Sequence, residues 1–143
     1  MKKKVENQYL ANKINTATPL ELVIIAYEGA INFLKEAKNS YEHKNIQGGG
    51  DSIIKSQKII RELRNSLDME VKDVSENLFF LYRQMDKNLT AVAKSKHLIL
   101  LNRVISMLDE LKNSWVSISK NAASLETAQK RPVHDAQYVN TYR

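Results

Sequence analysis

Residues 18–42 read TPLELVIIAYEGAINFLKEAKNSYE, and this stretch decides the fold class. Thr18 is placed to cap a helix with its hydroxyl, and Pro19 suits the first helical position because the N–H that it lacks would have no partner there. Glu21, three residues after Thr18, completes a capping box. Apolar residues then recur at steps of three and four as far as Tyr41. The stretch therefore predicts one long amphipathic helix.

Two further helices are predicted downstream of this stretch. The glycine triplet Gly48–Gly50 interrupts the chain, so we expect the second helix to begin after it, with Asp51 as its cap, and to end near Leu67. A short link then leads to Asp73, and Glu76 three positions later repeats the capping-box spacing. We therefore expect a capping-box-like start of the third helix, with Asp73 in the capping position.

The fourth predicted helix has the most regular pattern, with apolar residues at alternating steps of three and four between Leu101 and Ala122. Four helices of similar length with short links favour an all-α fold, an antiparallel up-down four-helix bundle. We expect this bundle over residues 18–122. A short N-terminal cap segment without sustained periodicity precedes it at residues 1–17, and a flexible C-terminal tail follows at residues 123–143.

Net charge and its distribution argue against a nucleic-acid partner. The chain has 143 residues and a formal net charge of +6. Most of the excess lies in residues 1–17 and 120–143, whereas the basic residues between them alternate with acids, as in Lys35–Glu36. A nucleic-acid-binding domain would carry a basic face on its ordered part. We therefore interpret the charged residues as solvated helix surface.

The sequence offers no set of residues for catalysis or metal binding. It has no cysteine, and none of its three histidines has the glutamate three positions earlier that a di-iron site in a helical bundle requires. Neither a phosphate-binding glycine loop nor a nucleophile turn occurs. We therefore expect no enzyme activity, no cofactor and no metal.

The chain also shows no membrane or targeting segment. No apolar run approaches the ~20 residues that cross a bilayer, and Met1–Lys4 is not followed by the apolar run of a signal peptide. We therefore expect a cytoplasmic protein without membrane insertion.

One helical segment carries more apolar residues than a single buried stripe requires. Residues 78–82 read LFFLY, so part of this segment should emerge from the bundle. Two interpretations stay open: a broad face towards the core, or an apolar groove that accepts a partner helix. Trp115 lies on the apolar seam of the fourth helix, and we expect it in the core.

Four short motifs occur in order along the chain. They are TATPLEL at residues 16–22, AYEGAI at residues 26–31, SLDME at residues 66–70, and NLFFLY at residues 77–82. Together with Trp115 near the end of the last helix, they resemble the signature of the flagellar secretion chaperones, the FliS family. The resemblance covers about residues 7–118.

Two positions depart from the family pattern. Gly48–Gly50 stands where that family has helix-compatible residues, which predicts a late start of the second helix. Val71–Val74 stands where that family has glycines, which predicts a differently shaped link before the third helix.

The resemblance implies an export chaperone that binds the disordered C-terminal region of flagellin. Covering that region would prevent premature polymerisation in the cytoplasm and present the subunit to a component of the flagellar export gate. It also implies a mobile N-terminal cover, with Tyr9, Leu10 and Ile14 as its candidate residues. Candidate walls of the groove are carried by the three following helices: Tyr27, Leu63, Leu67, Leu78, Leu81 and Tyr82.

Other interpretations remain open for both the residues and the function. Each candidate wall residue could serve ordinary core packing, whereas Tyr9 lies outside the periodic segments and needs another role. The protein could instead be a regulatory or adaptor bundle that self-associates or binds another flagellar or export component. A nucleic-acid binder that uses its basic tails is a third hypothesis.

Overall fold

Five helices make up most of the part of the chain that the computed structural model describes, residues 2–129. They are α1 (Lys2–Thr16), α2 (Pro19–Glu42), α3 (Ile46–Asn65), α4 (Lys72–Ser95) and α5 (Leu98–Gln129). No strand occurs within residues 2–129. The expected all-α class is confirmed, but the expected number of four helices is wrong, because the N-terminal segment forms a helix of its own.

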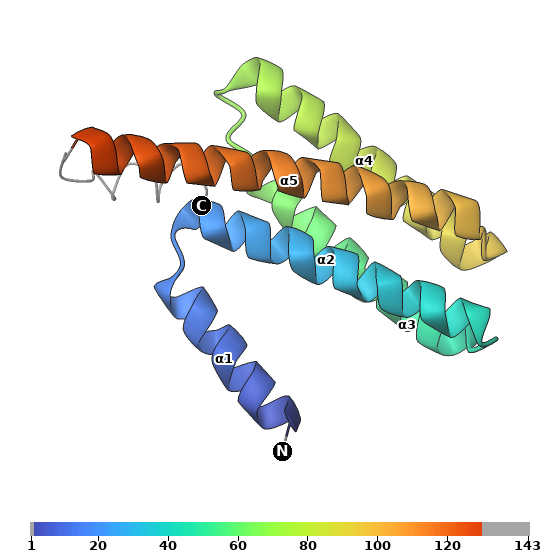
Figure 1. Cartoon of the computed structure of the whole chain (residues 1–143). Helices are drawn as coiled ribbons and strands as arrows, with labels where there is room; N and C mark the ends of the chain where they lie inside the picture. Colours follow the sequence, from blue (N-terminus) through green and yellow to red (C-terminus); the bar gives the residue numbers. More distant parts are fainter. Residues whose placement is uncertain (1, 130–143) are drawn as a thin grey trace.

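Helices α2 to α5 surround one core. α2 packs against α3 and α5, and α4 packs against the same two helices. The chain reverses direction from each of these helices to the next, whereas α1 projects away from them (Figure 1). No helix within the described residues is long and apolar enough to cross a membrane.

The start of α2 follows the predicted capping pattern. The Thr18 hydroxyl accepts a hydrogen bond from the Glu21 N–H at 3.2 Å, and Pro19 is the first helical residue. The helix ends at Glu42, as the apolar pattern predicts. Tyr27 and Leu34 on its inner face are fully buried, and burying an aliphatic or aromatic side chain of this size contributes ~1.5–3 kcal/mol. Local capping and core packing therefore select the same helix.

The predicted start of the next helix is wrong. α3 begins at Ile46, and the Asn45 side chain caps it by accepting a hydrogen bond from the Gly48 N–H at 3.0 Å. Asp51 is therefore a residue within the helix and not its cap, and the late start implied by the family comparison does not occur. The glycine triplet is helical because Gly49 packs directly against the Tyr41 ring: a Cβ added at Gly49 would lie 2.5 Å from that ring.

The predicted capping position of α4, Asp73, is also wrong, by two residues. α4 begins at Lys72, and the capping position is taken by Val71, which makes no side-chain cap. Asp68, in the link between α3 and α4, makes two hydrogen bonds that hold the start of α4 instead. The Asp68 carboxylate accepts the Glu70 N–H at 3.0 Å, and the Asp68 carbonyl accepts the Ser75 hydroxyl at 2.5 Å. Side-chain bonds across the link thus replace a capping box.

Helices extend towards both ends of the chain. Residues 2–16, which show no sustained apolar period, form α1, and its described side chains are exposed. One ion pair joins it to α2, between Lys13 and Glu28 at 3.7 Å. At the other end, α5 continues to Gln129, past the expected boundary at residue 122. The remainder of the expected flexible tail, residues 130–143, lies outside the described residues.

The apolar seam of α5 is buried only along its first half. Leu101, Val104 and Leu108 belong to the core, whereas Ile118 is exposed. Trp115 lies between the buried part of α5 and its exposed part. It is half-buried and packs against the core. The prediction that places Trp115 within the core is therefore wrong. Its position at the boundary brings it into the site described next.

Candidate functional site

The excess of apolar residues on α4 does emerge from the bundle. Phe80 is 65% exposed and Phe79 is also exposed, whereas Leu78 and Tyr82 are buried. The segment 78–82 is therefore wider than the buried face of α4, as the sequence predicts. Leu78 and Tyr82 turn towards a cavity at one end of the bundle.

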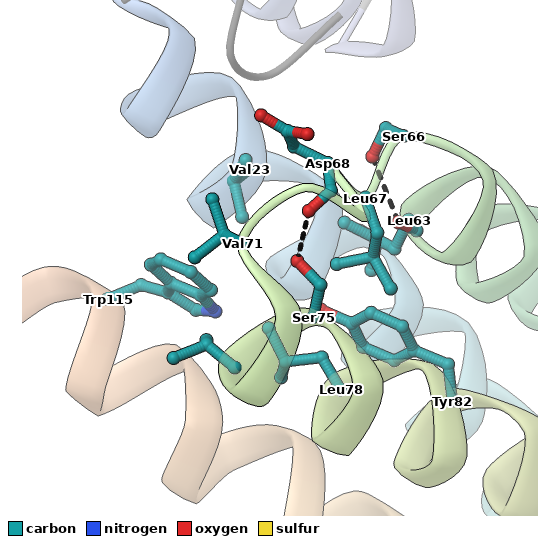
Figure 2. Close-up of a pocket in the computed structure, with 11 residues that line it drawn as sticks. Val23, Leu63, Ser66, Leu67, Asp68, Val71, Ser75, Leu78, Tyr82 and Trp115 are labelled. Carbon is teal, nitrogen blue, oxygen red and sulfur yellow. Dashed lines mark hydrogen bonds between the residues drawn. The ribbon is translucent and has the colours of Figure 1, made fainter.

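This cavity, which we call the α3–α4 pocket, lies beside the link between α3 and α4. Its volume is about 120 Å³, somewhat smaller than the ~150 Å³ apolar cavity that admits benzene. The side chains around it converge from α2, α3, the link, α4 and α5 (Figure 2). Its lining consists of Val23, Leu63, Ser66, Leu67, Asp68, Val71, Val74, Ser75, Leu78, Tyr82 and Trp115.

Apolar side chains also surround the mouth of the pocket. Val71 and Val74 line it and are each more than half exposed, and Met69, in the link with Val71, is nearly half exposed. Exposed apolar residues that continue into an apolar pocket are typical of an interaction site, because a partner that covers them removes their surface from water.

Two hydroxyls in the pocket lining already donate to the backbone. The Ser66 hydroxyl donates to the Leu63 carbonyl at 2.9 Å, and the Ser75 hydroxyl donates to the Asp68 carbonyl at 2.5 Å (Figure 2). Their protons therefore do not face a ligand. The walls consequently present chiefly hydrocarbon surface.

Two tyrosines from different helices meet at the base of the pocket. The hydroxyls of Tyr27 and Tyr82 are hydrogen-bonded, and their rings are tilted by 52° with centroids 6.3 Å apart. Burial raises the pKa of Tyr82 far above its ordinary value, and Tyr27 raises it further. Burial also raises the pKa of Tyr27, although the hydrogen bond to Tyr82 opposes this rise. Both phenols therefore stay neutral at physiological pH.

The structure brings four of the predicted wall residues together in this pocket: Leu63, Leu67, Leu78 and Tyr82. Tyr27 lies beneath them in contact with Tyr82. Leu81 is partly buried and packs against the core, and it is not part of the lining.

The sequence analysis missed four apolar residues of the lining: Val23, Val71, Val74 and Trp115. Two of them belong to Val71–Val74, the stretch that departs from the family pattern, and this departure was the available signal. Val23 follows the apolar spacing of the helix at residues 18–42, and Trp115 is expected in the core, so neither stands out in the sequence as a site residue.

The three residues predicted to cover the groove lie elsewhere in this structure. Tyr9, Leu10 and Ile14 are on α1, and all three are exposed, Tyr9 by 70%. α1 projects from the bundle (Figure 1), and none of the three side chains lines the pocket. Their role as a mobile cover stays a prediction.

Within the described residues, no group of three or more histidine, cysteine, aspartate or glutamate side chains is arranged to hold a metal ion.

Comparison with known proteins matches this chain to one family, through a family model and through individual relatives. Residues 1–122 match the family model described as flagellar protein FliS. The flagellar secretion chaperone FliS of Bacillus subtilis (strain 168) is 27% identical over 114 residues, which cover 78% of this chain and 85% of that protein. The protein of the same name in Vibrio cholerae serotype O1 is 29% identical over 119 residues, covering 82% and 88%. The flagellar secretion chaperone FliSB of Pseudomonas aeruginosa is 32% identical over 108 residues, covering 75% and 86%.

Proposed function

Because this chain belongs to the family of the flagellar protein FliS, we infer that it is a flagellar secretion chaperone and not an enzyme. We propose that its client is the C-terminal segment of flagellin and that this segment docks in the α3–α4 pocket. By occupying that segment in the cytoplasm, the chaperone prevents premature polymerisation and keeps the subunit ready for export. The export gate is the second partner in this proposal.

The observation that carries the proposal is the apolar pocket with an apolar rim. Leu63, Leu67 and Leu78 supply hydrocarbon walls, and Val71 and Val74 extend them to the surface. A disordered client loses conformational entropy when it folds on a partner, so the apolar area that it buries has to offset that cost. A continuous hydrocarbon surface provides this area, and isolated exposed residues would not.

The N-terminal helix completes the proposal. Tyr9, Leu10 and Ile14 are exposed apolar side chains on a helix that one exposed ion pair, Lys13 with Glu28, joins to α2. An exposed ion pair of this kind contributes ~0–1 kcal/mol, so α1 can exchange positions at little cost. We propose that α1 covers the pocket when no client is bound and that the client displaces it.

A calorimetric titration with a synthetic flagellin C-terminal peptide tests this function. We expect one-to-one binding with a negative heat-capacity change, because apolar surface is buried. We also expect a weak dependence on salt concentration, because few charges take part. Binding that disappears at high salt would contradict the apolar mechanism, and absence of binding would contradict the choice of client.

A matched pair of surface variants tests the location. Val74 and Ile54 are β-branched and 56% and 52% exposed, but only Val74 lines the pocket. Val74→Ser should weaken peptide binding roughly five- to tenfold, since about 1–1.5 kcal/mol of apolar burial is lost. Ile54→Ser should leave the affinity unchanged. Equal losses in the two variants would show that the peptide does not dock in the α3–α4 pocket.

A further inference from the structure

Three buried hydrogen-bond donors belong to residues that line the α3–α4 pocket or lie directly beneath its lining. They are the hydroxyls of Tyr27 and Tyr82 and the indole N–H of Trp115. Tyr27 is fully buried, Tyr82 is 2% exposed, and the Trp115 nitrogen is inaccessible to solvent. Such donors normally have acceptors, because a buried donor without one costs ~1–3 kcal/mol.

The cluster holds more donor protons than its own hydrogen bonds use. The two hydroxyls form one hydrogen bond with each other, in which either oxygen can donate. One phenolic proton is therefore left over whichever way this bond runs. Trp115 lowers the pKa of Tyr27, but its buried indole N–H has no hydrogen-bond partner within the part of the chain that the structure describes.

The neighbouring polar groups of the pocket do not take up the surplus proton. The Asp68 carbonyl accepts from Ser75, and the Leu63 carbonyl accepts from Ser66. The Asp68 carboxylate accepts the Glu70 N–H, and Figure 2 shows it on the far side of the link from Tyr82. No hydrogen bond from either tyrosine to another described residue occurs.

Tyr82 is the member of the tyrosine pair that a ligand can reach, because Tyr82 lines the pocket and Tyr27 does not. In Figure 2, the hydroxyl end of the Tyr82 side chain lies on the side of Ser75, among the residues that line the pocket. If Tyr27 donates to Tyr82, the Tyr82 proton is free to point at a ligand. This arrangement requires rotation of hydroxyl hydrogens only, with no movement of heavy atoms.

We propose that Tyr82 donates a hydrogen bond to a carbonyl oxygen of the segment seated in the α3–α4 pocket, beside a branched aliphatic side chain that fills the pocket. This inference rests on the proposed function for the identity of the segment. In the client, the oxygen would be a carbonyl without a partner in its own helix, such as one of the last four of a helix. Tyr82 therefore selects the register in which the client docks.

The test uses N-isobutylacetamide, which combines an isobutyl group with one carbonyl oxygen. Trp115 is the single tryptophan of the chain, so its indole N–H gives one resonance with which to follow the titration by NMR. Tyr82→Phe removes the donor that faces the pocket. Tyr27→Phe is the matched control, because it removes the same internal hydrogen bond but leaves the Tyr82 hydroxyl in place.

We expect Tyr82→Phe to bind the amide roughly five- to tenfold more weakly than the unaltered protein. Tyr27→Phe should bind it within about twofold of the unaltered protein, since its pocket donor is intact. Equal affinities in the two variants, or a larger loss in Tyr27→Phe, would overturn the inference.

A second measurement decides the matter if Tyr82→Phe does not fold. Replacing Tyr82 by 3-fluorotyrosine keeps the shape of the side chain and makes its hydroxyl a stronger donor, so the amide should bind more tightly than to the unaltered protein. Unchanged or weaker binding would overturn the inference. The amide titration does not involve flagellin, so a flagellin peptide that fails to bind would contradict the proposed client and leave the result for Tyr82 intact.

Discussion

Gly49 and Gly50 are neighbours in α3, but their surroundings are opposite. A Cβ at Gly49 would lie 2.5 Å from the Tyr41 ring, whereas a Cβ at Gly50 would meet nothing within 4 Å. Gly49 is thus required by the close approach of α2 and α3. Gly50 has no such contact and carries only the entropic cost of glycine within a helix.

This contrast predicts stability changes of opposite sign. Gly49→Ala should lower the free energy of unfolding by ~1–3 kcal/mol, because the added methyl group forces Tyr41 or the backbone to move. Gly50→Ala should raise it by ~0.5–1 kcal/mol. Urea denaturation monitored by circular dichroism measures both. A destabilising Gly50→Ala, or a neutral Gly49→Ala, would contradict the packing described for the start of α3.

The tyrosine pair at the base of the pocket predicts a loss of stability at alkaline pH. Burial raises the pKa values of Tyr27 and Tyr82 above the ordinary value of about 10. A raised pKa in the folded state means that the stabilisation is complete below about pH 10. Above that value it is lost, because the unfolded chain releases the protons first.

Each buried tyrosine should then lower the free energy of unfolding by up to ~1.4 kcal/mol per pH unit. Denaturant titrations between about pH 8 and pH 11 measure this slope. The Tyr27→Phe/Tyr82→Phe double variant is the control, because its other titrating groups are unchanged. An equally steep slope in the double variant would assign the alkaline loss to those other groups.

A cluster of polar side chains joins α3 and α4. The Arg61 guanidinium donates twice to the Asp86 carboxylate, at 3.0 and 3.2 Å, and the Gln57 amide donates to the same carboxylate at 3.0 Å. The Asp86 side chain is only 17% exposed, so these bonds are partly shielded from water. They fix the relative position of the two helices whose link borders the pocket.

Asp86→Ala should therefore lower the free energy of unfolding by ~1–3 kcal/mol, because it leaves Arg61 without its ion pair and removes one of the acceptors of the buried Gln57 amide, which keeps the Thr90 hydroxyl at 3.0 Å. Asp109→Ala is the matched control, since Asp109 forms an exposed pair with Lys112 within α5; its effect should stay within ~0.5 kcal/mol. Thermal unfolding compares the two. Equal effects would mean that the shielded contact adds nothing beyond an exposed ion pair.

Comparison of the elements shows which of them were predictable. The start of α2 is encoded locally by Thr18, Pro19 and Glu21, and the structure has it as predicted. The start of α3 is not encoded locally, because contact with Tyr41 and the Asn45 cap override the low helix propensity of three glycines. The helical nature of α1 was not predictable because its few apolar residues, among them Tyr9, Leu10 and Ile14, do not form a sustained helical period, and the bundle buries none of its described side chains.

The candidate site was predictable only in part for a related reason. Leu63, Leu67, Leu78 and Tyr82 lie within or beside periodic segments, and the resemblance to the family marked them. The rim depends on Val71 at the end of the link and on Val74 in the first turn of α4, and both lie before the apolar stripe that the sequence marks from Leu78 onwards. Trp115 follows the seam of its helix, but α5 extends past the region where the seam is buried. Which residues meet at the end of a bundle depends on helix length and packing, and sequence periodicity does not specify either.

At the scale of the whole molecule, the helices place a rigid core and an open apolar end side by side. The buried residues run from Tyr27 and Leu34 on α2 to Leu101 and Leu108 on α5. The pocket lies beside the link between α3 and α4, where exposed apolar residues surround it. Docking of the proposed client at this end therefore does not require unfolding of the core.

Tryptophan fluorescence during titration with a flagellin C-terminal peptide tests this central claim most directly. Trp115 is the only tryptophan in the sequence, it is half-buried, and it lines the α3–α4 pocket. A client seated in the pocket removes the rest of the indole from water, so we predict a shift of the emission to shorter wavelength that saturates at one peptide per chaperone. Calorimetric binding of the peptide with an unchanged Trp115 emission would contradict the account, because it would place the client elsewhere on the molecule.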